Sequence, residues 1–339
     1  MAARYSGRAV WVVSSPAAGE DSGMDLSTSP LLERLAPARH VLIAGGGGGF
    51  DVFSGLPLYF RLRELGKTVT LANLSFTQLS KVQGTWPVPG VLQVEASTEG
   101  PEYYFPEGWL SRWFARRGDK VPVYCFEQTG MASLREAYAA LQAHLGFDAV
   151  VLVDGGTDIL MRGDEVGLGT PHEDIASLGA VQALAVPEKL VVCLGFGVDF
   201  HHGVCHAHFL ESVAALSKEG GYLGVTALLE AMPEVALYKD AVAFVCERMP
   251  RAPSIVSLSV VSALEGDYGD VHRTERTRGS TLWINPLMSM YWAFDLMAVA
   301  RRCLYLEALK DTTTQAQMHL IIEAFRATRP VRPWKDIPV

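Results

Sequence analysis

Aspartates that follow glycine-containing turns are the residues of this sequence best suited to chemistry. Asp154 and Asp158 flank a Gly-Gly-Thr turn. Asp51 follows a run of glycines, and Asp199 follows the segment Gly-Phe-Gly-Val. Carboxylate oxygens can hold a hard divalent cation, accept hydrogen bonds from sugar hydroxyls, or take a proton from water. We therefore predict a carboxylate-rich ligand site. Its candidate metal ligands are Asp154 and Asp158, for which Mg²⁺ or Ca²⁺ suits better than Zn²⁺; an Asx turn with a helix cap is the alternative.

An uninterrupted run of five glycines, residues 45–49, follows the apolar residues 41–44. Backbone amides in such a turn can bind a phosphate at the start of the following helix. The dinucleotide fingerprint Gly-x-Gly-x-x-Gly fails at its third glycine, which falls on Phe50 or Asp51, and no phosphate-loop Gly-Lys-Ser/Thr follows. Asp51 either caps the helix or contacts a ligand or metal. Its charge repels a phosphate unless a cation or a sugar hydroxyl lies between them.

Asp199 precedes a histidine-rich segment, which suggests acid–base chemistry. The candidate catalytic residues are Asp158, Asp199 and His202, with Asp199 or His202 as the general base that activates water. His202 and His206 are four residues apart, as zinc ligands on one helix face are. Gly203 interrupts that spacing and no His-Glu-x-x-His pattern occurs, so zinc is the less favoured interpretation. Histidines at a helix start with no special role are the alternative.

Two segments rich in charge and glycine offer further ligand contacts. Residues 161–174 come soon after Asp158, and residues 266–280 hold three arginines within six residues, which could clamp a phosphate or carboxylate. Solvated surface turns are the alternative for both segments. Glu173 and Asp174 are expected to begin a helix, where negative charge is favourable. The candidate ligand-binding residues are Gly46, Gly47, Gly48, Gly49, Asp51, Asp154, Gly155, Gly156, Thr157, Arg162, Asp164, Glu165, Asp267, Asp270, Arg273 and Arg276.

Alternating strands and helices are expected to position these residues. Predicted strands cover residues 40–44, 68–72, 121–126, 149–153, 189–194, 222–225 and 254–261. Predicted helices cover residues 56–65, 134–145, 173–185, 205–218, 228–246, 286–309 and 314–327. This order predicts an α/β fold with a doubly wound, mostly parallel, Rossmann-like sheet and helices on both faces. Because parallel strands end at one crevice, the aspartates should gather there, and their mutual repulsion should raise some of their pKa values.

The sequence divides into one main domain with flanking segments. Residues 1–28 are predicted to be an extension or linker with an edge strand at 9–13, and residues 29–330 a single α/β domain. Residues 77–120, rich in proline and tryptophan, interrupt the alternation. They either cover the site as a lid or pack as a loop with a short helix near 108–116. Residues 331–339 are expected to be an extended tail.

Composition narrows the class of protein. The net charge of -8 argues against a general binder of nucleic acid or of anionic membranes. No apolar run reaches the ~18 residues of a transmembrane helix, and residues 9–13 are too short for the core of a signal peptide. The five cysteines are scattered without a Cys-x-x-Cys pair, which is typical of free thiols in a cytoplasmic protein.

From about Ser29 to Arg329 the chain resembles an uncharacterised family catalogued as domain of unknown function 1152. The matching stretches are residues 44–51 with 56–58, 154–158, 162–165 with 169–171, and 195–199. The resemblance implies an α/β fold, and no catalytic role is carried over from it. The first 28 residues lie outside the resemblance.

The combined features predict an enzyme that hydrolyses or transfers a group on a nucleoside, nucleotide or sugar-phosphate-like ligand. An NAD-dependent oxidoreductase is the first alternative, weakened by the failed fingerprint and by Asn73 where that fold carries an acidic residue. A non-catalytic nucleotide-binding sensor is the second. The expected partner is a small molecule with a phosphate or ribose, and the apolar residues 286–309 form either core or the interface of a homo-oligomer.

Overall fold

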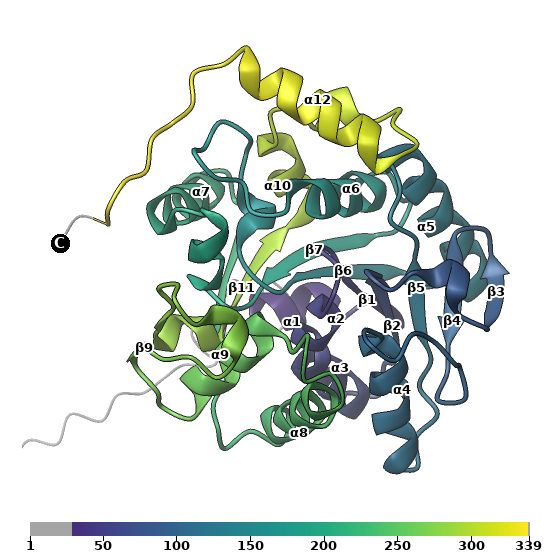
Figure 1. The fold of residues 1–339 in the computed structure, drawn as a ribbon. Helices are drawn as coiled ribbons and strands as arrows, with labels where there is room; N and C mark the ends of the chain where they lie inside the picture. Colours follow the sequence, from purple (N-terminus) through teal and green to yellow (C-terminus); the bar gives the residue numbers. More distant parts are fainter. Residues whose placement is uncertain (1–28, 338–339) are drawn as a thin grey trace, which may run out of the picture.

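A mixed β-sheet of nine strands forms the centre of the protein (Figure 1), which this computed structural model describes over residues 29–337. The predicted N-terminal extension and its edge strand at 9–13 therefore lie outside the described residues. The sheet order is β3-β4-β5-β2-β1-β6-β7-β11-β8. The five central strands run parallel: β5 (Val123–Phe126), β2 (Thr68–Leu74), β1 (His40–Gly45), β6 (Ala149–Asp154) and β7 (Glu188–Cys193). The edges are antiparallel: β3 (Thr85–Val88) and β4 (Val91–Val94) on one side, β11 (Met290–Asp295) and β8 (Tyr222–Ala227) on the other.

Helices cover both faces of this sheet (Figure 1). Side chains of β1 alternate between the faces: Leu42 and Ala44 join one apolar cluster, and Val41 and Ile43 join the other. The first face carries α5 (Met131–Leu145), α6 (Pro171–Gln182), α7 (His206–Lys218), α10 (Leu296–Arg302), α11 (Leu306–Leu309) and α12 (Gln315–Ala327). The second carries α1 (Pro30–Leu35), α2 (Asp51–Ser54), α3 (Leu56–Glu64), α4 (Pro106–Arg116), α8 (Pro233–Arg248) and α9 (Ile255–Leu264). The chain is thus an α/β protein with a large, mostly parallel mixed sheet flanked by helices.

Strand β1 lies at the point where the order of the sheet reverses. It pairs in parallel with β2 on one side and with β6 on the other. The strands that come next along the chain, β2 and β5, therefore extend the sheet on one side of β1, and the later strands β6 and β7 extend it on the other side. The amide of Gly46 donates a hydrogen bond of 2.8 Å to the carbonyl of Val153. This bond ties the start of the glycine turn to the end of β6. Open α/β sheets bind ligands at such a reversal, beyond the carboxyl ends of the strands.

The strand predicted at residues 254–261 is wrong, because these residues belong to α9. Their many β-branched side chains favour a strand when taken alone. The helix begins at a serine cap, and a second serine satisfies its hydroxyl within the helix. Ser254 caps the helix by accepting a hydrogen bond of 3.0 Å from the amide of Ser257, and Ser259 donates back to the carbonyl of Ile255 at 2.8 Å.

The long helix predicted at residues 286–309 is also wrong. The run begins with a 3₁₀ turn, η5 (Pro286–Ser289), continues as strand β11, and only then forms the helices α10 and α11. In β11, Trp292 and Phe294 pack on one face of the sheet and Tyr291 and Ala293 on the other. A continuously apolar run is typical of a strand that is buried on both faces, and length alone suggested a helix.

The insertion at residues 77–120 forms ordered structure at one edge of the sheet. It contains the 3₁₀ turn η1 (Leu79–Lys81), the edge strands β3 and β4, and α4, which corresponds to the short helix predicted near 108–116. The lid role of this segment stays a prediction. Residues 331–337 contain no helix, in keeping with the expected extended tail. Within residues 29–337, no helix combines the length and the apolar character needed to cross a membrane.

Candidate functional site

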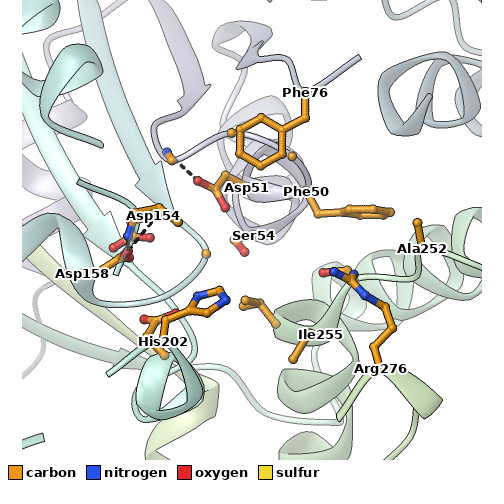
Figure 2. A pocket seen from close by; sticks show the side chains of 18 of the residues that line it. Phe50, Asp51, Ser54, Phe76, Asp154, Asp158, His202, Ala252, Ile255 and Arg276 are labelled. Carbon is orange, nitrogen blue, oxygen red and sulfur yellow. Dashed lines mark hydrogen bonds between the residues drawn. The ribbon is translucent and has the colours of Figure 1, made fainter. Parts of the chain in front are cut away.

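A pocket of about 360 Å³ opens beyond the carboxyl ends of β1, β6 and β7 (Figure 2). Its walls come from the glycine turn, from the loops after β6 and β7, and from the segments around residues 76, 103, 254 and 276. The lining residues are Gly47, Gly48, Gly49, Phe50, Asp51, Ser54, Phe76, Tyr103, Tyr104, Asp154, Gly155, Asp158, Thr170, Asp199, His201, His202, Ala252, Ser254, Ile255, Val256 and Arg276.

Five carboxylates surround the floor of this pocket, and none of them is more than 9% exposed. They come from four segments of chain around the sheet edge, because Asp154 and Asp158 flank a single turn. No lysine, arginine or histidine within residues 29–337 forms an ion pair with any of them. The five are Asp51 at the start of α2, Asp154 at the end of β6, Asp158 in the 3₁₀ turn η2 (Asp158–Leu160), Asp174 in α6, and Asp199 in the 3₁₀ turn η3 (Val198–His202). The predicted gathering of strand-end aspartates is therefore seen in the structure.

Backbone amides take the place of cations in holding these side chains. An amide that points at a carboxylate oxygen supplies partial positive charge without bringing in another side chain. Four of the five carboxylates are oriented in this way. The amide donors are Gly47 to Asp51 (2.6 Å), Ile159 to Asp154 (3.2 Å), Thr170 to Asp158 (2.6 Å) and Thr157 to Asp199 (2.7 Å).

Glycines provide the space that the carboxylates occupy. A Cβ atom on Gly47 would lie 2.5 Å from Oδ1 of Asp174 and 2.9 Å from Oδ2 of Asp51. A Cβ atom on Gly156 would lie 2.4 Å from Oδ2 of Asp199. Both distances to the nearest oxygen are shorter than any ordinary contact, so a larger residue would displace a carboxylate. The other glycines that face the cluster in this way are Gly155 and Gly169.

Asp174 is a member of the cluster that the sequence did not reveal. It lies in the first turn of α6, as predicted, but its side chain is completely buried against the glycine turn. Oδ2 accepts a hydrogen bond of 3.2 Å from the hydroxyl of Thr170, and Oδ1 has no partner among the described residues. An acidic residue in a first helical turn is usually explained by its favourable interaction with the helix dipole. Nothing in the sequence therefore placed Asp174 in the carboxylate cluster.

Burial raises the pKa values of these carboxyl groups. Desolvation, reinforced by the charge of Asp158, raises the pKa of Asp51 to about 8, although the amide of Gly47 acts against the shift. Burial first, and then the neighbouring aspartates, raise the pKa values of Asp154, Asp174 and Asp199 well above their usual range. The sequence suggested mutual repulsion as the cause, whereas desolvation is the larger one.

Aromatic and basic side chains complete the wall of the pocket. In Figure 2, Phe76 lies above Asp51 and Phe50 lies to its right, and the guanidinium of Arg276 lies across the space from Asp154. Tyr103 and Tyr104 complete this aromatic wall. Arg276, in the 3₁₀ turn η4 (Glu275–Thr277), donates a hydrogen bond of 2.7 Å to the carbonyl of Pro253. Among the described residues that line the pocket, it is the only lysine or arginine.

Two adjacent histidines lie beside the acidic floor. Nδ1 of His201 is 2.7 Å from the carbonyl oxygen of Val198, so this nitrogen is placed to donate its hydrogen. Burial, and next the neighbouring His201, lower the pKa of His202, which favours its neutral form. His202 and His206 do not share a helix, because Gly203 ends η3 with a φ of +83° before α7 begins. They therefore lack the helical spacing that the zinc interpretation needed.

Three predicted ligand residues lie in an ion-pair network outside the pocket. Arg332, from the C-terminal segment, contacts Asp164 at 2.9 Å and the fully buried Glu165 at 2.6 Å. Arg162 lies 3.3 Å from the same Asp164. Two residues further along, Trp334 packs edge-on against a ring of η3. These charges fasten the tail to the domain.

The other predicted residues outside the pocket have structural contacts. Arg273 pairs with Asp267 at 2.6 Å, and Asp270 accepts a hydrogen bond of 3.0 Å from the amide of Leu282. Three more lie just behind the lining: Gly46, Gly156 and Thr157.

Asn73, at the end of β2, faces the glycine turn and not the pocket. Its side-chain amide donates to the carbonyl of Gly49 at 2.9 Å and to Oε1 of the buried Glu107 at 2.8 Å. In dinucleotide-binding folds the residue at this position reaches the ribose hydroxyls. Here both hydrogens of the amide are used within the protein.

Comparison with known families agrees with the resemblance seen in the sequence. The model of a family described as "Protein of unknown function (DUF1152)" matches residues 110–327. The chain belongs to this family. The matched region holds four of the five clustered carboxylates, while Asp51 and the glycine turn precede it. Searches of curated proteins and of solved structures gave no significant match.

The raised pKa of Asp51 predicts that the metal-free protein loses stability as the pH rises. Between its ordinary value of 3.8 and about 8, the folded state holds this proton more tightly than the unfolded chain does. The stabilisation is complete below the lower value and disappears as the pH rises through the upper one. Each such group costs up to about 1.4 kcal/mol per pH unit within this window. Urea unfolding of EDTA-treated protein at pH 6, 7 and 8 measures the slope, and Asp51→Asn should make it shallower. An equally steep slope in the variant would contradict this assignment.

The network around Arg332 predicts that a change at its buried carboxylate lowers stability more than a change at its exposed one. Glu165 accepts hydrogen bonds from Arg332 and from the amides of Arg162 and Gly163. Because Glu165→Gln removes the charge and sets its new amide against these donors, it should lower the free energy of unfolding by about 2 kcal/mol. Glu211, which is 47% exposed and pairs with the same arginine at 2.7 Å, is the matched control. Glu211→Gln should cost under about 1 kcal/mol in the same urea titration. Equal effects of the two changes would show that burial does not set the strength of this network.

Proposed function

We propose that this protein is a hydrolase or transferase that acts on a nucleotide-like or sugar-phosphate-like small molecule in the pocket. The observation that carries the proposal is the cluster of five buried carboxylates, which lack an ion-pair partner within residues 29–337. Four of them, all except Asp174, line the same cavity as Arg276. Clustered carboxylates with raised pKa values in a cleft are more typical of a reacting or metal-binding site than of a stabilising one.

The order of the strands supports a nucleotide-like ligand. Along the chain, the parallel strands are β1, β2, β5, β6 and β7, and the sheet places them in the order third, second, first, fourth, fifth. Rossmann-like, doubly wound sheets share this order and bind their ligands where it reverses. The pocket lies at that reversal, between the ends of β1 and β6.

The polarity of the pocket suggests how such a ligand would lie. The amide of Gly47 is engaged by Asp51, so the glycine turn is less free for a phosphate than the sequence suggested. We place the anionic group of the ligand at Arg276, because a guanidinium binds phosphate oxygens in pairs. The rings of Phe50 and Phe76 offer apolar surfaces against which a base or sugar could pack.

His202 is the side chain best placed to take a proton from water. Its lowered pKa keeps the imidazole neutral near pH 7, and it lines the pocket next to Asp158. Asp158 and Asp199 would orient the water or the ligand hydroxyls. An NAD-dependent oxidoreductase is less favoured, because Asn73 is bonded to the glycine turn and not directed towards a ribose. A cytoplasmic location stays a prediction from the sequence.

The proposal predicts turnover that depends on His202. Purified protein is incubated with ATP, ADP, AMP, ADP-ribose, NAD and ribose 5-phosphate, with MnCl₂ or with EDTA, and products are separated by anion-exchange chromatography. At least one compound should be converted, and His202→Ala should lower kcat roughly 100-fold or more through loss of the base. His172 is the matched control, since it contacts His319 at 3.2 Å and does not line the pocket. Absence of conversion across the panel, or equal kcat in both histidine variants, would refute the proposal.

Arg276 predicts a separate effect on binding. Arg276→Ala should raise KM for the phosphate-containing compound about tenfold or more with a smaller change in kcat, because a charged contact to the anionic end is lost. Arg278, which is exposed and pairs with Glu275 at 2.8 Å, lies on the same turn and supplies the control Arg278→Ala. Steady-state kinetics on both variants measures the difference. A KM that rises equally in both would assign the effect to overall charge and not to the pocket.

A further inference from the structure

We propose that Asp51, Asp154 and Asp174 form a site for one divalent cation at the floor of the pocket. Each residue offers one carboxylate oxygen, and these three atoms all lie within 4.8 Å of one another. The set replaces the pair Asp154 and Asp158 that the sequence suggested. The role of the cation in turnover rests on the proposed function, whereas the site itself is argued from the geometry alone.

The spacing of the oxygens fits the coordination of a small hard cation. Around Mg²⁺, with bonds of about 2.1 Å, neighbouring ligands lie about 3 Å apart and opposite ligands about 4 Å apart. Around Ca²⁺, with bonds near 2.4 Å, the corresponding separations are about 3.4 and 4.8 Å. Three oxygens within 4.8 Å of one another therefore need little movement to share one ion. The three residues provide only oxygen ligands, which favours Mg²⁺, Mn²⁺ or Ca²⁺ over softer ions.

An unpartnered oxygen of Asp174 points to a missing ligand. This side chain is 0% exposed, and its Oδ1 has no hydrogen-bond partner among the described residues. A Cβ atom on Gly47 would lie 2.5 Å from this oxygen and 2.9 Å from Oδ2 of Asp51, so the two oxygens border one small space. A buried, unpaired carboxylate oxygen is costly. A cation in the adjoining space would satisfy it.

A second unpartnered group, Ser54, lies on the pocket side of the same carboxylates. Its hydroxyl is 1% exposed and has no hydrogen-bond partner within residues 29–337. A Cβ atom on Gly155 would meet Oδ1 of Asp51 at 2.6 Å and this hydroxyl at 3.1 Å, which places the two oxygens on the same side of that glycine. In Figure 2 the hydroxyl lies just below Asp51 and faces the cavity. Tyr291 fixes its backbone by donating to the carbonyl of Ser54.

The arrangement leaves the ion open to the ligand. Asp51 and Asp154 line the pocket, whereas Asp174 lies behind them, so protein oxygens occupy only the floor of the site. Water or a ligand oxygen would complete the coordination from the pocket side, as in catalytic metal sites. Asp158 and Asp199 then remain on the wall, free to contact that ligand.

Isothermal titration of EDTA-treated protein with MnCl₂ tests the site directly. The intact protein should bind one Mn²⁺, and Asp174→Asn should weaken this binding at least tenfold, because it removes a ligand charge and keeps the shape. Asp311→Asn, at an exposed position outside the pocket, is the matched control and should bind as the unchanged protein does. Circular dichroism checks that each variant folds.

A pair of glycine variants tests the same site without removing a carboxylate. Gly47→Ala places its methyl group between the oxygens of Asp51 and Asp174 and should also weaken Mn²⁺ binding at least tenfold. Gly46→Ala is the matched control, because its methyl group would meet only apolar side-chain atoms, the nearest of them Leu152 Cγ at 3.3 Å. Neither glycine has a positive φ, so the backbone accepts alanine at both positions.

The outcomes separate this proposal from the proposed function. Absence of Mn²⁺ binding at millimolar concentrations would overturn the site, as would unchanged binding in both Asp174→Asn and Gly47→Ala. Turnover that persists in EDTA, by a protein that binds no Mn²⁺, would overturn the cation site and leave the proposed function intact. Specific Mn²⁺ binding without turnover of any compound would support the site and refute the proposed function.

Discussion

The burial of five carboxyl groups at one edge of the sheet is the constraint on which the surrounding structure depends. Five carboxylates are taken out of water there, at a cost that no neighbouring side-chain cation within residues 29–337 offsets. Amides at the ends of the loops supply the compensating dipoles, and glycines keep the backbone close enough to provide them. The loops after β1, β6 and β7 are therefore shaped around oxygen atoms. The apolar clusters on both faces of the sheet must provide the stability that this edge lacks.

The pocket is polar along one direction, because carboxyl groups line its floor and a single guanidinium lies across from them. The sheet supplies its acidic floor, while the turn η4 supplies Arg276 and the segments around Phe76 and Tyr104 supply the aromatic wall. Under the proposed function, this arrangement would orient a ligand that carries a hydroxyl-rich or metal-bound end and an anionic end.

Predictions from the sequence were most accurate where a residue pattern has a single structural explanation. Apolar runs followed by glycine and aspartate located β1, β6 and β7, and with them Asp51, Asp154 and Asp199. Predictions were least accurate where one pattern has two explanations. Asp174 looked like an ordinary first-turn acid, and the β-branched residues of α9 suggested a strand although they lie in a helix capped by Ser254. Glu165 resembled a ligand residue because its partner, Arg332, is 167 positions away in the chain. Contacts of that kind depend on tertiary structure, which local patterns do not encode.

The C-terminal segment reaches the pocket wall from outside the site. Arg332 fastens it to residues 164–165, and the ring of Trp334 lies 5.2 Å from that of Phe200, centroid to centroid. Phe200 belongs to η3, the turn that also carries Asp199 and His202. The far end of the chain thus braces a turn that lines the pocket. Proteolytic clipping of this segment, or a bulky affinity tag fused to it, would therefore disturb one wall of the pocket although every pocket residue were intact.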